Sequence, residues 1–123
     1  MAISAQAAGA KISLKERPEI FDQLLQIGIA HEIREKCETL SARTLKAKLR
    51  LLQIYNEARA LGYSYEEVKV YTRDKDEQER LRQAAYAYLD EHGVNRDDPT
   101  SYCPLGLEEM KSKSQIGNLL KAN

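Results

Sequence analysis

The chain's only two cysteines, Cys37 and Cys103, constrain its fold more than any other feature. A disulfide between them would close a loop of 66 residues (103 − 37) and add about 4 kcal/mol of stability by restricting the unfolded chain. The spacing is too long for a Cys-x-x-Cys redox pair, and the chain has too few soft ligands for zinc. We favour a disulfide, and two separate buried thiols remain the alternative.

Length and charge limit the class of protein. The 123 residues fit one domain, and 19 Lys and Arg balance 19 Asp and Glu. The formal net charge is therefore zero, and no excess of positive charge would attract the chain to nucleic acid. The longest apolar run, Leu24 to Ile33, is interrupted by polar residues and is shorter than the ~18 residues that span a bilayer, so we expect no transmembrane segment.

The first ten residues are nearly all small and carry no charged side chain, unlike the rest of the chain. Within them, 5–7 and 8–10 both match the small-x-small pattern at which secretory signals are cleaved, although no apolar stretch precedes them. We interpret residues 1–13 as a flexible tail and a signal-peptide remnant, followed by a single helical domain over 14–123. An ordinary flexible terminus is the alternative.

Apolar residues recur at helical spacing in the first half of the chain. Glu19 to Lys36 follows Pro18, a favoured first-turn residue, and is apolar around most of its circumference, which predicts a central, buried helix. Gly28 within it predicts a close helix crossing or a small kink. Ser41 is the expected N-cap of a second helix that ends at Gly62. Its broad apolar stripe comprises Leu45, Leu49, Leu52 and Tyr55, with Leu51, Ile54, Ala58 and Leu61 beside it.

Helix signals continue to the C-terminus. Ser64 and Glu67 form a capping box before a short helix, and Asp74 or Asp76 caps a helix that ends at His92 and Gly93. Pro104 disfavours helical backbone at the residue before it. The remaining helical segments are therefore expected over 104–111 and 114–120. No alternating strand pattern is present, so the sequence predicts an all-α single compact bundle of about five helices, held by one disulfide.

The second predicted helix is basic. Arg43, Lys46, Lys48, Arg50 and Arg59 oppose only Glu57, a net charge of +4 (5 − 1). Residues 64–92 carry a net charge of −3 (5 − 8), so the two segments can complement each other. We interpret both as solvated helix faces and expect no nucleic-acid partner.

Six side chains are candidates for a ligand or partner surface, namely His31, Tyr63, Tyr65, Tyr86, Tyr88 and Tyr102. His31 shares a helix face with Ile20, Leu24 and Ile27, so we favour a structural role at the rim of the core. Tyrosines most often serve as half-buried edges of a core. No catalytic motif, metal-ligand set or phosphate-binding loop is recognisable, so we expect no catalytic residues, no metal and no cofactor.

Several short landmarks together resemble a small uncharacterised family of exported alphaproteobacterial proteins. They are residues 28–33, Cys37, residues 41–43, residues 61–63, Cys103, residues 105–106 and residues 114–120. The resemblance implies secretion and paired cysteines, and it assigns no catalytic residue.

We therefore expect a non-catalytic protein that is periplasmic or secreted. The first hypothesis is a binding or accessory module that docks on another envelope protein. The alternatives are a small-molecule-binding helical domain and an acid or stress chaperone of the periplasm, which would expose apolar surface at low pH.

Overall fold

The computed structural model describes residues 12–123, and most of them lie in five α-helices. The helices are α2 (Pro18–Lys36), α3 (Thr44–Ala60), α4 (Tyr65–Arg73), α5 (Lys75–Glu91) and α6 (Tyr102–Ser112). Three short 3-10 helices, η1 (Leu14–Glu16), η2 (Pro99–Ser101) and η3 (Gly117–Leu119), and two strands, β1 (Leu40–Ala42) and β2 (Leu120–Ala122), complete the fold. The predicted all-α class is confirmed.

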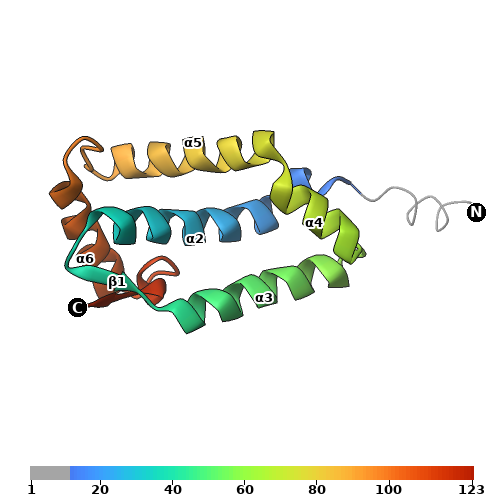
Figure 1. The fold of residues 1–123 in the computed structure, drawn as a ribbon, viewed down its shortest axis with the longest axis horizontal. Helices are drawn as coiled ribbons and strands as arrows, with labels where there is room; N and C mark the ends of the chain where they lie inside the picture. The colour runs from blue at the N-terminus through green and yellow to red at the C-terminus, as the bar shows by residue number, and fades with distance from the viewer. Residues whose placement is uncertain (1–11) are drawn as a thin grey trace, which may run out of the picture.

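Helix α2 is the central element, as the sequence predicts. It contacts α3, α5 and α6, and it lies between α3 and α5 in Figure 1. Pro18 occupies its first turn, where the missing N–H removes no hydrogen bond. The close helix crossing expected at Gly28 is wrong, because a Cβ built there would meet no atom within 4 Å, and the alternative of a small kink stays a prediction.

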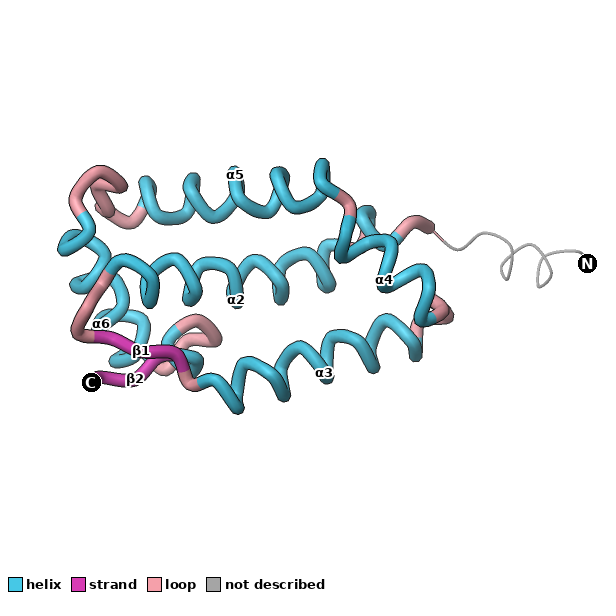
Figure 2. Tube along the Cα trace, viewed as in Figure 1, coloured by secondary structure: helices cyan, strands magenta, loops and turns pink. Residues whose placement is uncertain are grey.

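The predicted start of the second helix is also wrong. Ser41 lies in β1, and α3 begins at Thr44 with no side-chain cap. The cause is a distant strand: β1 pairs antiparallel with β2, with Ser41 opposite Lys121. Figure 2 shows this two-stranded sheet at the end of the molecule that carries the C-terminus. Three-residue strands are too short to show an alternating pattern, so the sequence did not reveal them.

Helix α4 begins at its predicted cap, and α5 begins at Asp74, one of its two predicted caps, and ends where the sequence predicts. Ser64 and Glu67 form the capping box of α4. The Asp74 side chain caps α5 by accepting a hydrogen bond from the Glu77 N–H, three residues further along the chain. Gly93, at φ +83°, follows the C-cap His92. This left-handed conformation is one that glycine adopts without strain.

The start of α6 differs from the prediction by two residues. The helix begins at Tyr102, so Cys103 is helical although Pro104 follows it. Proline is tolerated there because the first-turn N–H groups have no partner within the helix. After α6, the predicted final helical turn is the shorter η3, which leads into β2.

The predicted disulfide is confirmed. Cys37 and Cys103 are joined with an S–S distance of 2.06 Å and a Cα–Cα distance of 5.2 Å. Cys37 is the C-cap of α2, and Cys103 lies in the first turn of α6. The bond therefore ties the end of the central helix to the C-terminal segment.

Buried side chains form two separate clusters along α2. The first core cluster surrounds the C-terminal half of α2 and includes Ile33, Cys37, Leu89, Tyr102 and Leu120. The second core cluster lies at the other end and consists of Leu14, Ile20, Ile54, Ala58, Tyr63 and Tyr71. Ile12 and Ser13, which the sequence analysis assigned to the tail, belong to the described structure. The other residues of that predicted tail lie outside the described residues.

Two glycine substitutions test this packing. A Cβ at Gly117 would lie 2.0 Å from the Glu109 carbonyl oxygen, so Gly117→Ala must move backbone and should destabilise the protein by about 1–3 kcal/mol. Gly28→Ala meets open space inside a helix and should stabilise it by about 0.5–1 kcal/mol. Urea unfolding of both variants measures the difference, and equal midpoints would contradict the described packing.

Candidate docking surface on α3

Helix α3 has apolar residues on two opposite faces. Its inner face carries Ile54 and Ala58, which are 5% and 2% exposed and belong to the second core cluster. Leu45, Leu49 and Leu52 are spaced four and three residues apart, so they form one stripe on the other side of the helix. Their side chains are 70%, 52% and 53% exposed. The predicted apolar stripe therefore exists, but its leucines point to solvent and not into the core.

A groove of about 210 Å³ adjoins this stripe, between α2, α3 and α4. Leu51 and Tyr55 of α3 line it together with Leu24 of α2 and Val68 of α4. Leu51 is 46% exposed, and Tyr55 is half-buried. None of the three stripe leucines lines the groove, but Tyr55 is three residues after Leu52 and therefore lies beside it on the helix surface. We call the stripe and the groove together the α3 face.

Two tyrosines bound the α3 face at its end near α4. The rings of Tyr55 and Tyr65 meet edge-on, with centroids 6.0 Å apart. The Arg59 guanidinium donates a 3.0 Å hydrogen bond to the Tyr55 hydroxyl, and the Lys69 ammonium lies 5.4 Å from the centre of the Tyr65 ring. Arg59 thus binds the hydroxyl of Tyr55, and Lys69 lies over the ring face of Tyr65.

On its other side the leucine stripe borders a polar hollow of about 240 Å³ between α3 and η3. Lys46, Leu49, Arg50 and Gln53 line the hollow from α3, and Gln115 faces them. Helix α3 carries Lys46, Lys48, Arg50 and Arg59 against Glu57, a net charge of +3 (4 − 1). None of the ion pairs found in residues 12–123 includes any of these four cations.

The structure does not bring the six predicted surface residues together. His31 is exposed on α2, where its Nδ1 lies 3.3 Å from Arg34 Nη2. The expected place of His31 at the rim of the core is therefore wrong, because its helix face passes from buried at Ile20 to half-buried at Leu24 and Ile27 and to exposed at His31. Of the six, only Tyr65 borders the α3 face.

Two of the predicted tyrosines are buried. Tyr63 is 2% exposed, accepts a 3.0 Å hydrogen bond from Arg17 Nε and donates to the Ile12 carbonyl. Tyr102 is 1% exposed in the first core cluster, and burial raises the pKa of its hydroxyl. Tyr102 lines none of the hollows found in the described residues, whereas Tyr63 lines a hollow of about 350 Å³ together with Val70 and Tyr71.

Tyr86 and Tyr88 are half-buried on α5. The Arg96 guanidinium lies 4.2 Å from the centre of the Tyr86 ring and pairs with Asp90 at 3.0 Å. The Tyr88 ring stacks on His92 at a centroid distance of 3.9 Å. Both residues therefore adjoin the turn after α5.

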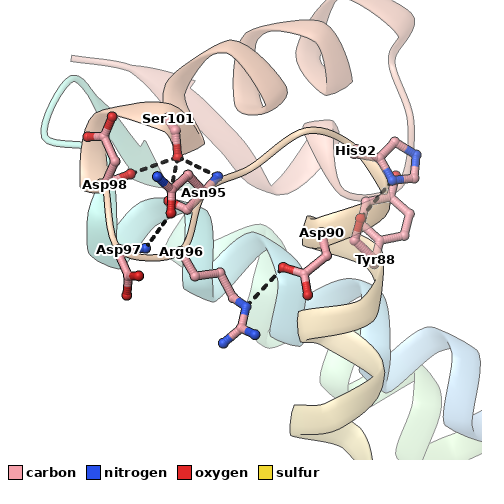
Figure 3. A network of polar contacts seen from close by, with 8 residues as sticks. All are labelled: Tyr88, Asp90, His92, Asn95, Arg96, Asp97, Asp98 and Ser101. Atoms are coloured by element: carbon pink, nitrogen blue, oxygen red, sulfur yellow. Dashed lines mark hydrogen bonds and ion pairs between the residues drawn. The ribbon is translucent and has the colours of Figure 1, made fainter.

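Figure 3 shows how this turn is held by polar contacts. The Ser101 hydroxyl lies 2.7 Å from the carbonyl oxygens of both Asn95 and Asp98, and it accepts from the Asn95 N–H at 3.0 Å. The Asn95 side-chain oxygen accepts from the Asp97 N–H at 3.1 Å. These bonds fix the connection that leads to Cys103, so the network has a structural role.

Two buried carboxylates were not predicted. Glu77 accepts a 2.9 Å hydrogen bond from the Tyr71 hydroxyl and pairs with Arg80 at 2.7 Å. Glu109 accepts from the hydroxyls of Tyr88 and Ser114. Burial, and then the hydrogen bond to the carboxylate, raise the pKa of Tyr71 and Tyr88. The tyrosine and serine partners of these carboxylates lie on other helices or turns, so the sequence does not show them. Only the pair of Glu77 and Arg80 has a spacing, three residues, that the sequence could reveal.

These carboxylates act as internal ties between elements. Every buried side-chain nitrogen or oxygen in the described part of the chain has a hydrogen-bond partner. No group of three or more His, Cys, Asp or Glu in residues 12–123 is arranged to hold a metal ion. Across the same residues, no helix has both the length and the apolar composition to cross a membrane.

The fold and its surface define a disulfide-linked helical protein with an exposed apolar helix face. The chain belongs to the family described as "Family of unknown function (DUF5333)", which matches residues 12–121. No curated protein and no solved structure matches the chain.

Substitutions on the two faces of α3 should differ in their cost to stability. The double variant Leu49→Gln/Leu52→Gln keeps helix propensity and removes exposed side chains, so its free energy of unfolding should stay within about 0.5 kcal/mol of the wild type. Ile54→Ala empties a buried position and should cost about 2–5 kcal/mol. Thermal and urea unfolding test both, and a cost for the double variant as large as that of Ile54→Ala would place these leucines in the core.

Proposed function

We propose that this protein is a non-catalytic docking module of the periplasm, which binds another envelope protein through the α3 face. The observation that carries the proposal is the exposed stripe of Leu45, Leu49 and Leu52 beside an apolar groove. Contiguous apolar surface on a soluble domain typically marks an interaction site. Because the inner face of α3 already packs in the second core cluster, the outer leucines are free to bind a partner.

The periplasmic location rests on the cysteines and on the sequence resemblance. Structural disulfides persist in oxidising compartments and are rare in the cytosol of mesophiles. The bond between Cys37 and Cys103 supports a place outside the cytosol. The exported and alphaproteobacterial character that the resemblance implies agrees with it and belongs to the same proposal.

A small-molecule-binding role is the second candidate, and the groove between α2, α3 and α4 is the observation that favours it. Its volume of about 210 Å³ is below the ~300–1,000 Å³ of pockets that enclose a drug-sized ligand. Tyr55 and Tyr71 line the groove, whereas none of the six predicted surface residues does. The groove therefore suits one inserted side chain of a protein partner better than a whole enclosed ligand.

Site-specific photo-cross-linking tests the docking role. Benzoylphenylalanine replaces Leu49 or Leu52 in the cells from which the protein comes, and Leu107 of α6 serves as the matched control because it is 53% exposed. We expect one stoichiometric protein adduct from positions 49 and 52, and none from position 107. The adduct should disappear when Leu45→Gln is added to the position 49 variant, since that removes the neighbouring leucine of the stripe.

Two outcomes would contradict the docking role. The first is that positions 49 and 52 give no protein adduct. The second is that all three positions give the same set of adducts, which would indicate random contacts with abundant neighbours and no specific surface.

A further inference from the structure

We infer that the α3 face receives an acidic amphipathic helix of the partner protein. This inference rests on the proposed function and deepens it, because it specifies the chemistry of the segment that binds. Three observations carry it: the spacing of the leucines, the two different borders of the stripe, and the positive charge of α3, which no ion pair in residues 12–123 neutralises.

The leucine stripe has the dimensions of a contact between helices. Leu45 and Leu52 are seven residues apart, which is about two turns, or ~10 Å along the axis. Side chains at positions i, i+4 and i+7 on one helix interdigitate with the same spacing on another. Helix-in-groove binding uses this pattern of apolar anchors.

The two borders of the stripe require different side chains from that helix. On one side, exposed Lys48 borders the stripe, and beyond it Leu51, Tyr55 and Leu24 line the apolar groove, which can take a single large apolar anchor. On the other side, Lys46, Arg50 and Gln53 line the polar hollow, which suits carboxylates. A helix with an apolar stripe and acidic flanks satisfies both borders at once.

Charge decides among the possible occupants. Helix α3 has a net charge of +3, and Lys46 and Lys48 are exposed and border the stripe on its two sides. A second copy of the chain would bring two such helices together, and like charges across an interface oppose association. An anionic membrane would match the charge, but a flat headgroup layer would leave the groove unfilled. Acidic flanks on a partner helix match both the charge and the shape.

Two synthetic probe peptides of about 18 residues test the inference with the full oxidised chain. Both carry leucines at i, i+4 and i+7. The acidic peptide has glutamate on both flanks of its leucine stripe, and its basic twin has lysine there. Vesicles of phosphatidylglycerol form the third arm. Fluorescence anisotropy measures peptide binding, and co-sedimentation measures vesicle binding.

We expect the acidic peptide to bind at least about tenfold more tightly than its basic twin at low ionic strength. The difference should shrink as salt is raised past ~0.15 M, where charges are screened beyond ~8 Å. Lys46→Glu/Lys48→Glu should abolish the preference. Lys111→Glu, a charge reversal at an exposed position of α6, should leave it unchanged.

The inference is overturned by equal binding of the two peptides, by preference for the basic twin, by binding to vesicles alone, or by no binding in any arm. The cross-linking experiment separates this failure from that of the proposed function. A protein adduct at Leu49 together with any of these four outcomes would leave the docking role standing and remove only the acidic helix.

Discussion

The bond between Cys37 and Cys103 is the constraint on which the rest of the structure depends. It joins the C-cap of the central helix to the first turn of α6, and it therefore holds α6 against α2. Tyr102 and Leu105 next to it are buried, and β2 then returns to pair with β1 directly after α2. The C-terminal segment thus closes the first core cluster from one side.

Because the C-terminal segment completes the first core cluster, the apolar residues on the outer face of α3 remain exposed. The first core cluster is filled largely by α2, α5, α6 and the end of the chain, and of α3 only Ala47 packs against it. The C-terminal half of α3 is used in the second core cluster through Ile54 and Ala58. The leucines of the opposite face contribute nothing to either cluster, although large exposed apolar side chains reduce solubility. A partner that covers them gives a physical reason for their presence.

The sequence was informative where structure is determined locally. The capping box at Ser64, the cap at Asp74 and the stop at Gly93 depend on neighbours within a few residues, and all three predictions hold. Ser41 was misassigned because its partner strand lies about 80 residues away. The apolar periodicity of α3 identified the helix but not its inward side, because both faces carry apolar residues. The ties from Tyr71 to Glu77 and from Tyr88 to Glu109 depend on packing between elements, which spacing does not encode.

The dependence of the C-terminal segment on the disulfide is tested most directly by amide hydrogen exchange of the oxidised and the reduced protein. On reduction, α6, β1 and β2 should lose protection first, whereas α4 and the C-terminal half of α3 should keep theirs, because the second core cluster does not contain the cysteines. A uniform loss of protection across all helices, or unchanged protection in α6, would contradict this account.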